Sequence, residues 1–200
     1  MAQLKVPLDA ARFATGLTWT NYLAQMGDTR ARTEDNYRRA TLVDDERRFF
    51  AGLDRVRYAL MLAENWCGDV HRNSPLVARL VEALPRCELR IFFRDQNLDL
   101  TDCFLNNGYR SIPVVVFFDQ DWSEIGRWIE RPAAATQKML AIRAHTVDVA
   151  APDQQEAAMN EFRAQFQAAY HAPAAESLWR DAVKEIRQVL ELRLGLSRQP

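Results

Sequence analysis

The chain has 200 residues, of which 48% are hydrophobic, enough for one domain with a real core and helical additions. Its 26 Lys and Arg residues nearly balance 27 Asp and Glu residues, so no general attraction to nucleic acids or anionic membranes is expected. The segment from Met1 to Ala11 lacks the apolar core of a signal peptide, and the three cysteines are too few for a disulfide framework. These features predict a soluble protein in the reducing cytoplasm.

The first third of the chain is predicted to be helical and to form an extension over residues 1–54. Apolar residues between Pro7 and Gly27 recur at mostly helical spacing, which predicts one helix there. A second helix is expected from Thr33 to Phe50, with Thr33 as its N-cap.

The middle of the chain, residues 55–131, alternates short apolar runs with helical segments. The order strand–helix–strand–helix–strand–strand predicts an α/β fold, with a mixed sheet flanked by helices. Its first two strands should be parallel, and its last two should form an antiparallel hairpin. The expected strands are Val56–Ala63, Glu88–Arg94, Val114–Phe118 and Glu124–Ile129, and the expected helices are His71–Leu84 and Leu98–Asn107.

The remainder, residues 132–200, is predicted to be a helical part of the same single domain. Its helices are expected at Ala133–His145, Gln154–Tyr170 and Ala174–Leu194. We expect Trp122 and Trp128 of the preceding hairpin to pack against them. The helical extensions could also mediate homodimerisation.

The residues most informative about chemistry are Trp66 to Val70, between a predicted buried strand and a predicted helix. Cys67 would lie at the helix N-terminus, where backbone N–H groups and the helix dipole stabilise a thiolate. Asp69 would oppose this effect and a protonated His71 would assist it, and the sequence leaves the sum of the two open.

Three features of the chain resemble the thioredoxin superfamily. They are the Trp66-Cys67-Gly68 turn, Pro75 within the helix that follows, and Ile112-Pro113 directly before a buried strand. The longer string is similar to a bacterial thioredoxin-like group with a helical N-terminal extension. The resemblance implies a cis Ile112–Pro113 bond beside Cys67, with Cys67 as nucleophile. It also implies that Trp66, Gly68, Ile112 and Pro113 bind the substrate.

Two departures from the thioredoxin pattern concern the resolving step of the reaction. Val70 stands where these proteins have their second cysteine, and Met61 stands where they have a buried acid. We therefore expect monothiol thiol–disulfide exchange through Cys67, with protein or small-molecule thiols and disulfides as partners and without a cofactor. The alternative is a redox-inactive thioredoxin-fold module that binds a peptide or protein.

Other candidate residues carry weaker signals. Cys87 and Cys103 are interpreted as packing residues rather than as distant resolving thiols. Cys67 and His71 are spaced as one turn of a helix, but no second ligand pair follows, so no metal site is expected. His71 is instead expected at the surface.

Overall fold

The computed structural model describes residues 6–196, so the first five residues of the Met1–Ala11 segment discussed above lie outside the described residues. Its contacts divide the chain into two compact units. One unit consists of residues up to 130 together with residues from 186 onward, and the other of residues 131–185. The first unit contains the sheet and the candidate site.

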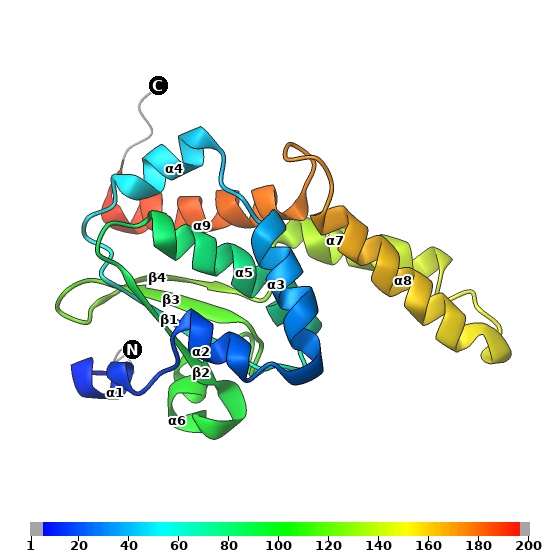
Figure 1. Cartoon of the computed structure of the whole chain (residues 1–200), viewed down its shortest axis with the longest axis horizontal. Coiled ribbons are helices and arrows are strands. Elements are labelled where there is room, and N and C mark those ends of the chain that lie inside the picture. The colour runs from blue at the N-terminus through cyan, green and yellow to red at the C-terminus, as the bar shows by residue number, and fades with distance from the viewer. Residues whose placement is uncertain (1–5, 197–200) are drawn as a thin grey trace. The chain divides into compact units, whose positions relative to one another are not determined.

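The first unit is built on one four-stranded mixed sheet, as predicted (Figure 1). β1 is parallel to β2 and antiparallel to β3, and β3 and β4 form the expected hairpin. Met61 of β1 is paired with Ile91 on one side and Val115 on the other. In sheet order the strands are β2 (Glu88–Phe93), β1 (Tyr58–Ala63), β3 (Val114–Phe118) and β4 (Glu124–Ile129).

The two central strands, β1 and β3, form the buried centre of the sheet. β3 is buried along its whole length, and β1 is buried from Ala59 to Ala63, which fits their almost continuous apolar sequences. The helix α5 (Gly68–Ala83) directly follows β1 in the chain and buries Leu76, Val77 and Leu80. Figure 1 shows α5 along the sheet with α3 (Arg30–Arg39) packed beside it.

The single N-terminal helix predicted between Pro7 and Gly27 is wrong. The chain forms α1 (Ala10–Ala14) and α2 (Trp19–Ala24), and between them Leu17 pairs with Ile91 of β2 through two backbone hydrogen bonds of 2.8 Å. A Cβ atom at Gly16 would lie 2.6 Å from the Phe92 ring. The break therefore has a physical cause, because the backbone here approaches the sheet edge too closely for a side chain.

The second predicted helix is also divided, into α3 and α4 (Asp44–Ala51). The acidic residues that begin α4 are favoured at a helix N-terminus, and the Glu46 carboxylate accepts a hydrogen bond from the Val43 N–H at 2.9 Å. Thr33 lies inside α3 rather than capping it, and its hydroxyl donates to the Thr29 carbonyl at 3.0 Å.

The segment after β2 is more irregular than the predicted helix Leu98–Asn107. Only a short α-helix forms, and the chain then continues in 3-10 geometry to Phe104. The short elements of this unit are η1 (Gly27–Thr29), η2 (Arg94–Gln96), α6 (Leu98–Thr101) and η3 (Asp102–Phe104).

The two hairpin tryptophans have different environments. Trp122 stacks on Tyr58 with ring centroids 4.0 Å apart and meets Phe13 of α1 edge-on, so its expected packing on the C-terminal helices is wrong. Trp128 is buried on β4, two positions from Gly126, where a Cβ atom would lie 2.5 Å from Cγ1 of Val189. Trp128 therefore shares the strand face that meets the C-terminal helix.

The second unit is helical, as predicted. It holds α7 (Ala133–His145), η4 (Pro152–Gln154), α8 (Gln155–Tyr170) and the start of α9 (Leu178–Leu194). α9 begins later than predicted because Ser177 turns the chain: its hydroxyl donates to the Tyr170 carbonyl at 2.6 Å and accepts from the Trp179 N–H at 3.2 Å. Within residues 6–196, no helix has the length and apolar character required to cross a bilayer.

Candidate functional site

Cys67 lies at the junction between β1 and α5 and is the N-cap residue of that helix. Its backbone is extended, with φ −80° and ψ 123°, and its carbonyl accepts the first helical hydrogen bond from the His71 N–H at 3.1 Å. The half-buried sulfur therefore lies at the positive end of a long helix dipole. This placement favours a thiolate over a thiol.

The loop before β3 meets this cysteine. The Ile112–Pro113 peptide bond is cis, and both residues are buried. The Cys67 thiol donates to the Ile112 carbonyl oxygen, with an Sγ to O distance of 3.7 Å. Because ionisation removes the S–H proton, this contact belongs to the neutral thiol and leaves the carbonyl available to another donor in the thiolate form.

Trp66 presents an apolar surface next to the cysteine. Its side chain is 59% exposed, and the Arg94 guanidinium lies over its ring at 5.0 Å from the centroid. Arg94 also donates to the Arg110 carbonyl at 3.0 Å, which links the Trp66 turn to the proline loop. Nearby in the sequence, Tyr109 is 74% exposed, whereas Arg110 makes a two-pronged ion pair with Asp102.

Gly68 and Asp69 begin α5 beside a mostly buried arginine. The Asp69 carboxylate lies 3.8 Å from the Arg72 guanidinium, so its charge is balanced locally. A Cβ atom at position 68 would lie 3.0 Å from Nη1 of Arg72. Glycine at this position therefore leaves room for that ion pair directly beside the cysteine.

His71 is buried, with 4% exposure, and the expectation of a surface histidine is wrong. Its Nδ1 lies 3.2 Å from the Thr33 hydroxyl, and its backbone carbonyl accepts from the Asn36 side chain at 2.8 Å. Burial, followed by the positive charges of Arg32 and Arg72, lowers the His71 pKa to about 4. At neutral pH His71 is therefore uncharged and supplies no positive charge to the cysteine.

Tyr22 and Glu64 are two site residues that the sequence reasoning missed. Tyr22 of α2 is fully buried, and its hydroxyl has no hydrogen-bond partner among residues 6–196. Burial raises the Tyr22 pKa well above its ordinary value, and the negative charges of Glu64 and Cys67 raise it further. The phenol therefore remains a protonated donor in the electrostatic neighbourhood of the cysteine.

Glu64 brings a buried carboxyl group close to this site, although Met61 occupies the position of the acid expected from thioredoxins. One Glu64 oxygen accepts from the Asp95 N–H at 2.8 Å. A charged residue directly after the apolar run of β1 was the available sequence signal. No comparable local signal pointed to Tyr22, because it lies far away in the chain.

The N-terminal extension also holds the turn that carries Trp66. The Thr29 hydroxyl donates to the Asn65 carbonyl at 3.1 Å, and the Asn65 side chain donates to the Gln25 carbonyl at 3.2 Å. Together with the Thr33 and Asn36 contacts to His71, these bonds fix both ends of the turn. The extension is therefore part of the site's framework.

Cys87 lies too far from Cys67 to resolve a disulfide there, and the pKa values of Cys87 and Cys103 are both raised. Cys87 precedes β2, whereas Cys67 follows the parallel strand β1, so they lie at opposite ends of the sheet. Burial raises the Cys87 pKa to about 12 and also raises that of Cys103. The Cys103 thiol donates to the Asp99 carbonyl at 3.3 Å. Within the described part of the chain, no three His, Cys, Asp or Glu side chains gather as metal ligands.

The mixed sheet, the cysteine at the start of α5 and the cis-proline loop against it define a thioredoxin-like protein with one cysteine in the turn between β1 and α5. A family model described as thioredoxin matches residues 16–148, and the chain belongs to this thioredoxin family. The match includes α2 and α3, so the helical extension is largely part of the family's own domain.

Two solved structures are similar to this chain in fold. One is a protein of unknown function from Pseudomonas aeruginosa, with 20% identity, a TM-score of 0.58, and coverage of 81% of this chain and 99% of that chain. The other is an HIV epitope-scaffold, with 18% identity, a TM-score of 0.57 and the same coverage of both chains. A search of curated proteins found no match to this chain.

Proposed function

We propose that this protein catalyses monothiol thiol–disulfide exchange through Cys67. The observation that carries the proposal is the sulfur at the N-terminus of α5, at 3.7 Å from the carbonyl oxygen that precedes Pro113. The helix end favours the thiolate, and the exposed Trp66 beside it offers an apolar surface to a substrate chain.

The reaction proceeds in two exchanges that balance without an added oxidant or reductant. The Cys67 thiolate attacks one sulfur of a substrate disulfide, forming a mixed disulfide and releasing the other sulfur as a thiolate, which takes a proton from water. Because Val70 has no thiol, a second, external thiolate must attack the substrate sulfur of the mixed disulfide. That attack forms a new disulfide and restores the Cys67 thiolate.

The surrounding residues have distinct parts in this scheme. Ile112 and Pro113 position the incoming chain, and the Ile112 carbonyl accepts a backbone N–H once Cys67 is ionised. Gly68 keeps the first turn of α5 open beside the Asp69–Arg72 pair. Tyr22 acts as a positioning residue: its phenol stays protonated, so it adds no negative charge to the electrostatic neighbourhood of the sulfur.

The test is native-state alkylation of Cys67 by iodoacetamide between about pH 4 and pH 10, followed by intact-mass spectrometry. The matched control is Cys67→Ser, which retains Cys87 and Cys103. We expect one fast-reacting thiol with an apparent pKa at least about one unit below the free-cysteine value of about 8.5. Incubation with oxidised glutathione should then give one mixed disulfide that added thiol reverses.

Two results would contradict exchange chemistry. One is a reaction no faster in the parent protein than in Cys67→Ser, and the other is an apparent pKa equal to that of a free thiol. In either case the exposed Trp66 would favour the second candidate function, a redox-inactive module that binds a peptide or protein. That module would retain its partner after Cys67→Ser and lose it after Trp66→Ala.

A further inference from the structure

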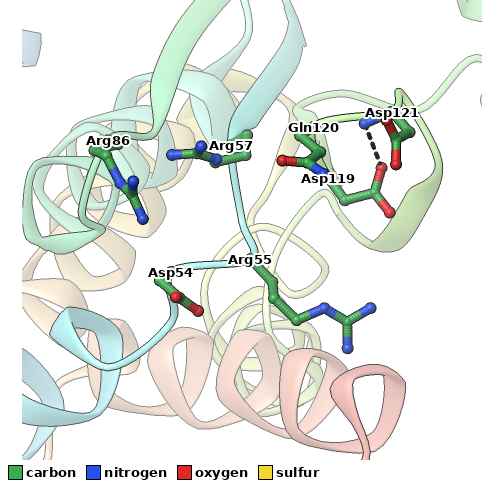
Figure 2. Close-up of a pocket in the computed structure, with 7 residues that line it drawn as sticks. All are labelled: Asp54, Arg55, Arg57, Arg86, Asp119, Gln120 and Asp121. Carbon is green, nitrogen blue, oxygen red and sulfur yellow. Dashed lines mark hydrogen bonds between the residues drawn. The ribbon is translucent and has the colours of Figure 1, made fainter.

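A hollow lies at the end of the sheet opposite to Cys67. It has a volume of about 440 Å³ and is formed by the turns that enter β1 and β2 and leave β3 (Figure 2). The backbone of Arg57 is held on both sides by the neighbouring strands: its N–H donates to the Phe118 carbonyl at 2.9 Å, and its carbonyl accepts from the Glu88 N–H at 3.0 Å. Seven residues line the hollow: Asp54, Arg55, Arg57, Arg86, Asp119, Gln120 and Asp121.

Three arginine side chains of this hollow have no partner among the residues that the structure describes. Arg55, Arg57 and Arg86 make no side-chain hydrogen bond or ion pair with any residue between 6 and 196, whereas many other arginines of the chain are paired. Figure 2 shows the Arg57 side chain extending toward the side of the hollow that carries Arg86. Two guanidinium groups that line one hollow repel each other, and an anion bound between them would attract both.

The backbone at Arg86 provides an independent indication. Arg86 has φ +59° in the turn between α5 and β2, a conformation in which glycine or asparagine is the favoured residue. A long cationic side chain stands there despite its backbone cost. Strained backbone that presents a charged group into a hollow is characteristic of binding sites.

The acidic residues of the hollow limit the class of ligand that it can bind. Asp119 fixes its own loop, since one carboxylate oxygen accepts from the N–H groups of Asp121 at 3.0 Å and Ser123 at 2.9 Å. Asp54 and Asp121 add carboxylates that repel a bare anion but accept hydrogen bonds from hydroxyl groups. The hollow is also larger than one phosphate group.

We propose that this hollow binds a phosphorylated polyol, with its phosphate between Arg57 and Arg86 and its hydroxyl groups on the carboxylates. The arginines supply the charge that a phosphate requires, and the carboxylates discriminate in favour of ligands that carry hydroxyl donors. The site is separate from Cys67, since it lies before β1 and Cys67 lies after it.

The test is isothermal titration calorimetry of the full-length protein with ribose 5-phosphate and with inorganic phosphate, at constant ionic strength set with chloride. We expect ribose 5-phosphate to bind at least about threefold more tightly than phosphate. Arg57→Gln and Arg86→Asn should each weaken the binding of ribose 5-phosphate at least about tenfold, which is the loss of one charged contact. Arg38→Gln, at an exposed arginine of α3, is the matched control and should leave binding unchanged.

Arg86→Asn separates binding from folding, because asparagine tolerates a positive φ better than arginine. Its melting temperature without ligand should equal or exceed that of the parent while its affinity falls. Absence of binding by the parent, or equal affinities in Arg57→Gln, Arg86→Asn and Arg38→Gln, would overturn the proposal. Equal affinity for the two probes would overturn the role of the carboxylates. None of these outcomes depends on the reactivity of Cys67.

Discussion

Acidification should destabilise this protein through His71. The ring is neutral in the folded state because burial and two neighbouring arginines lower its pKa from 6.5 to about 4. In the unfolded chain the same ring has the ordinary pKa and becomes protonated below about pH 6.5. Between these two values the unfolded state binds a proton that the folded state does not bind. The stability from the neutral ring is therefore complete above about pH 6.5 and is lost as the pH falls toward 4.

The size of this effect follows from the two pKa values. One pKa unit corresponds to about 1.4 kcal/mol, so the complete shift is worth about 3 kcal/mol. From about pH 7.5 to pH 5.0, linkage gives a loss of about 2 kcal/mol in the free energy of unfolding. A change of this size is a substantial fraction of the stability of a typical domain.

Urea denaturation followed by circular dichroism at these two pH values measures the loss. His71→Gln is the matched variant, because glutamine can still hydrogen-bond to Thr33 but does not titrate. The parent should lose about 2 kcal/mol more stability on acidification than the variant does. An equal loss in the two proteins would refute the assignment of His71 as a buried, neutral residue.

Three further substitutions test other parts of the structure. Tyr22→Phe removes a buried hydroxyl that has no partner among residues 6–196, so it should raise the free energy of unfolding by about 1 kcal/mol in urea titrations. The same substitution should move the pH profile of Cys67 alkylation to higher pH. An unchanged profile would show that Tyr22 does not influence the cysteine. Val70→Cys should give measurable reduction of insulin disulfides, and a folded variant without this activity would show that a second thiol alone does not restore dithiol chemistry. Gly126→Ala places a Cβ atom 2.5 Å from Val189 and should cost about 1–3 kcal/mol on thermal unfolding; an unchanged stability would contradict this contact.

The sheet was predictable because its strands carry strong local signals. The uninterrupted apolar run of β3 and the short apolar run of β1 are stable only when buried, so both were recognisable as central strands. The Trp66–Gly68 turn between a strand and a helix likewise predicted that Cys67 lies at a helix end. The broken N-terminal helices were not predictable from periodicity. Their apolar spacing is helical, and only the pairing of Leu17 with a distant strand ends the first segment.

The residues that surround the site were harder to predict from the sequence. Tyr22 and Thr33 approach the start of α5 only through tertiary packing. His71 lies four residues after Cys67 in the sequence, and this spacing alone does not indicate that Thr33 will pack against the histidine ring. The unpaired arginines before β1 and β2 were also invisible, since Arg57 and Arg86 are brought together only by the parallel pairing of the strands that follow them. Long-range geometry rather than composition defines these features.

The pairing of Leu17 with Ile91 has a consequence for solubility. β2 is an edge strand, and exposed edge strands recruit strands from other molecules and seed aggregates. The Leu17 backbone occupies both the donor and the acceptor of Ile91, and Gly16 lets the chain lie flat against the neighbouring Phe92. The residues ahead of the sheet therefore block intermolecular β-pairing at Ile91, near the middle of this edge strand.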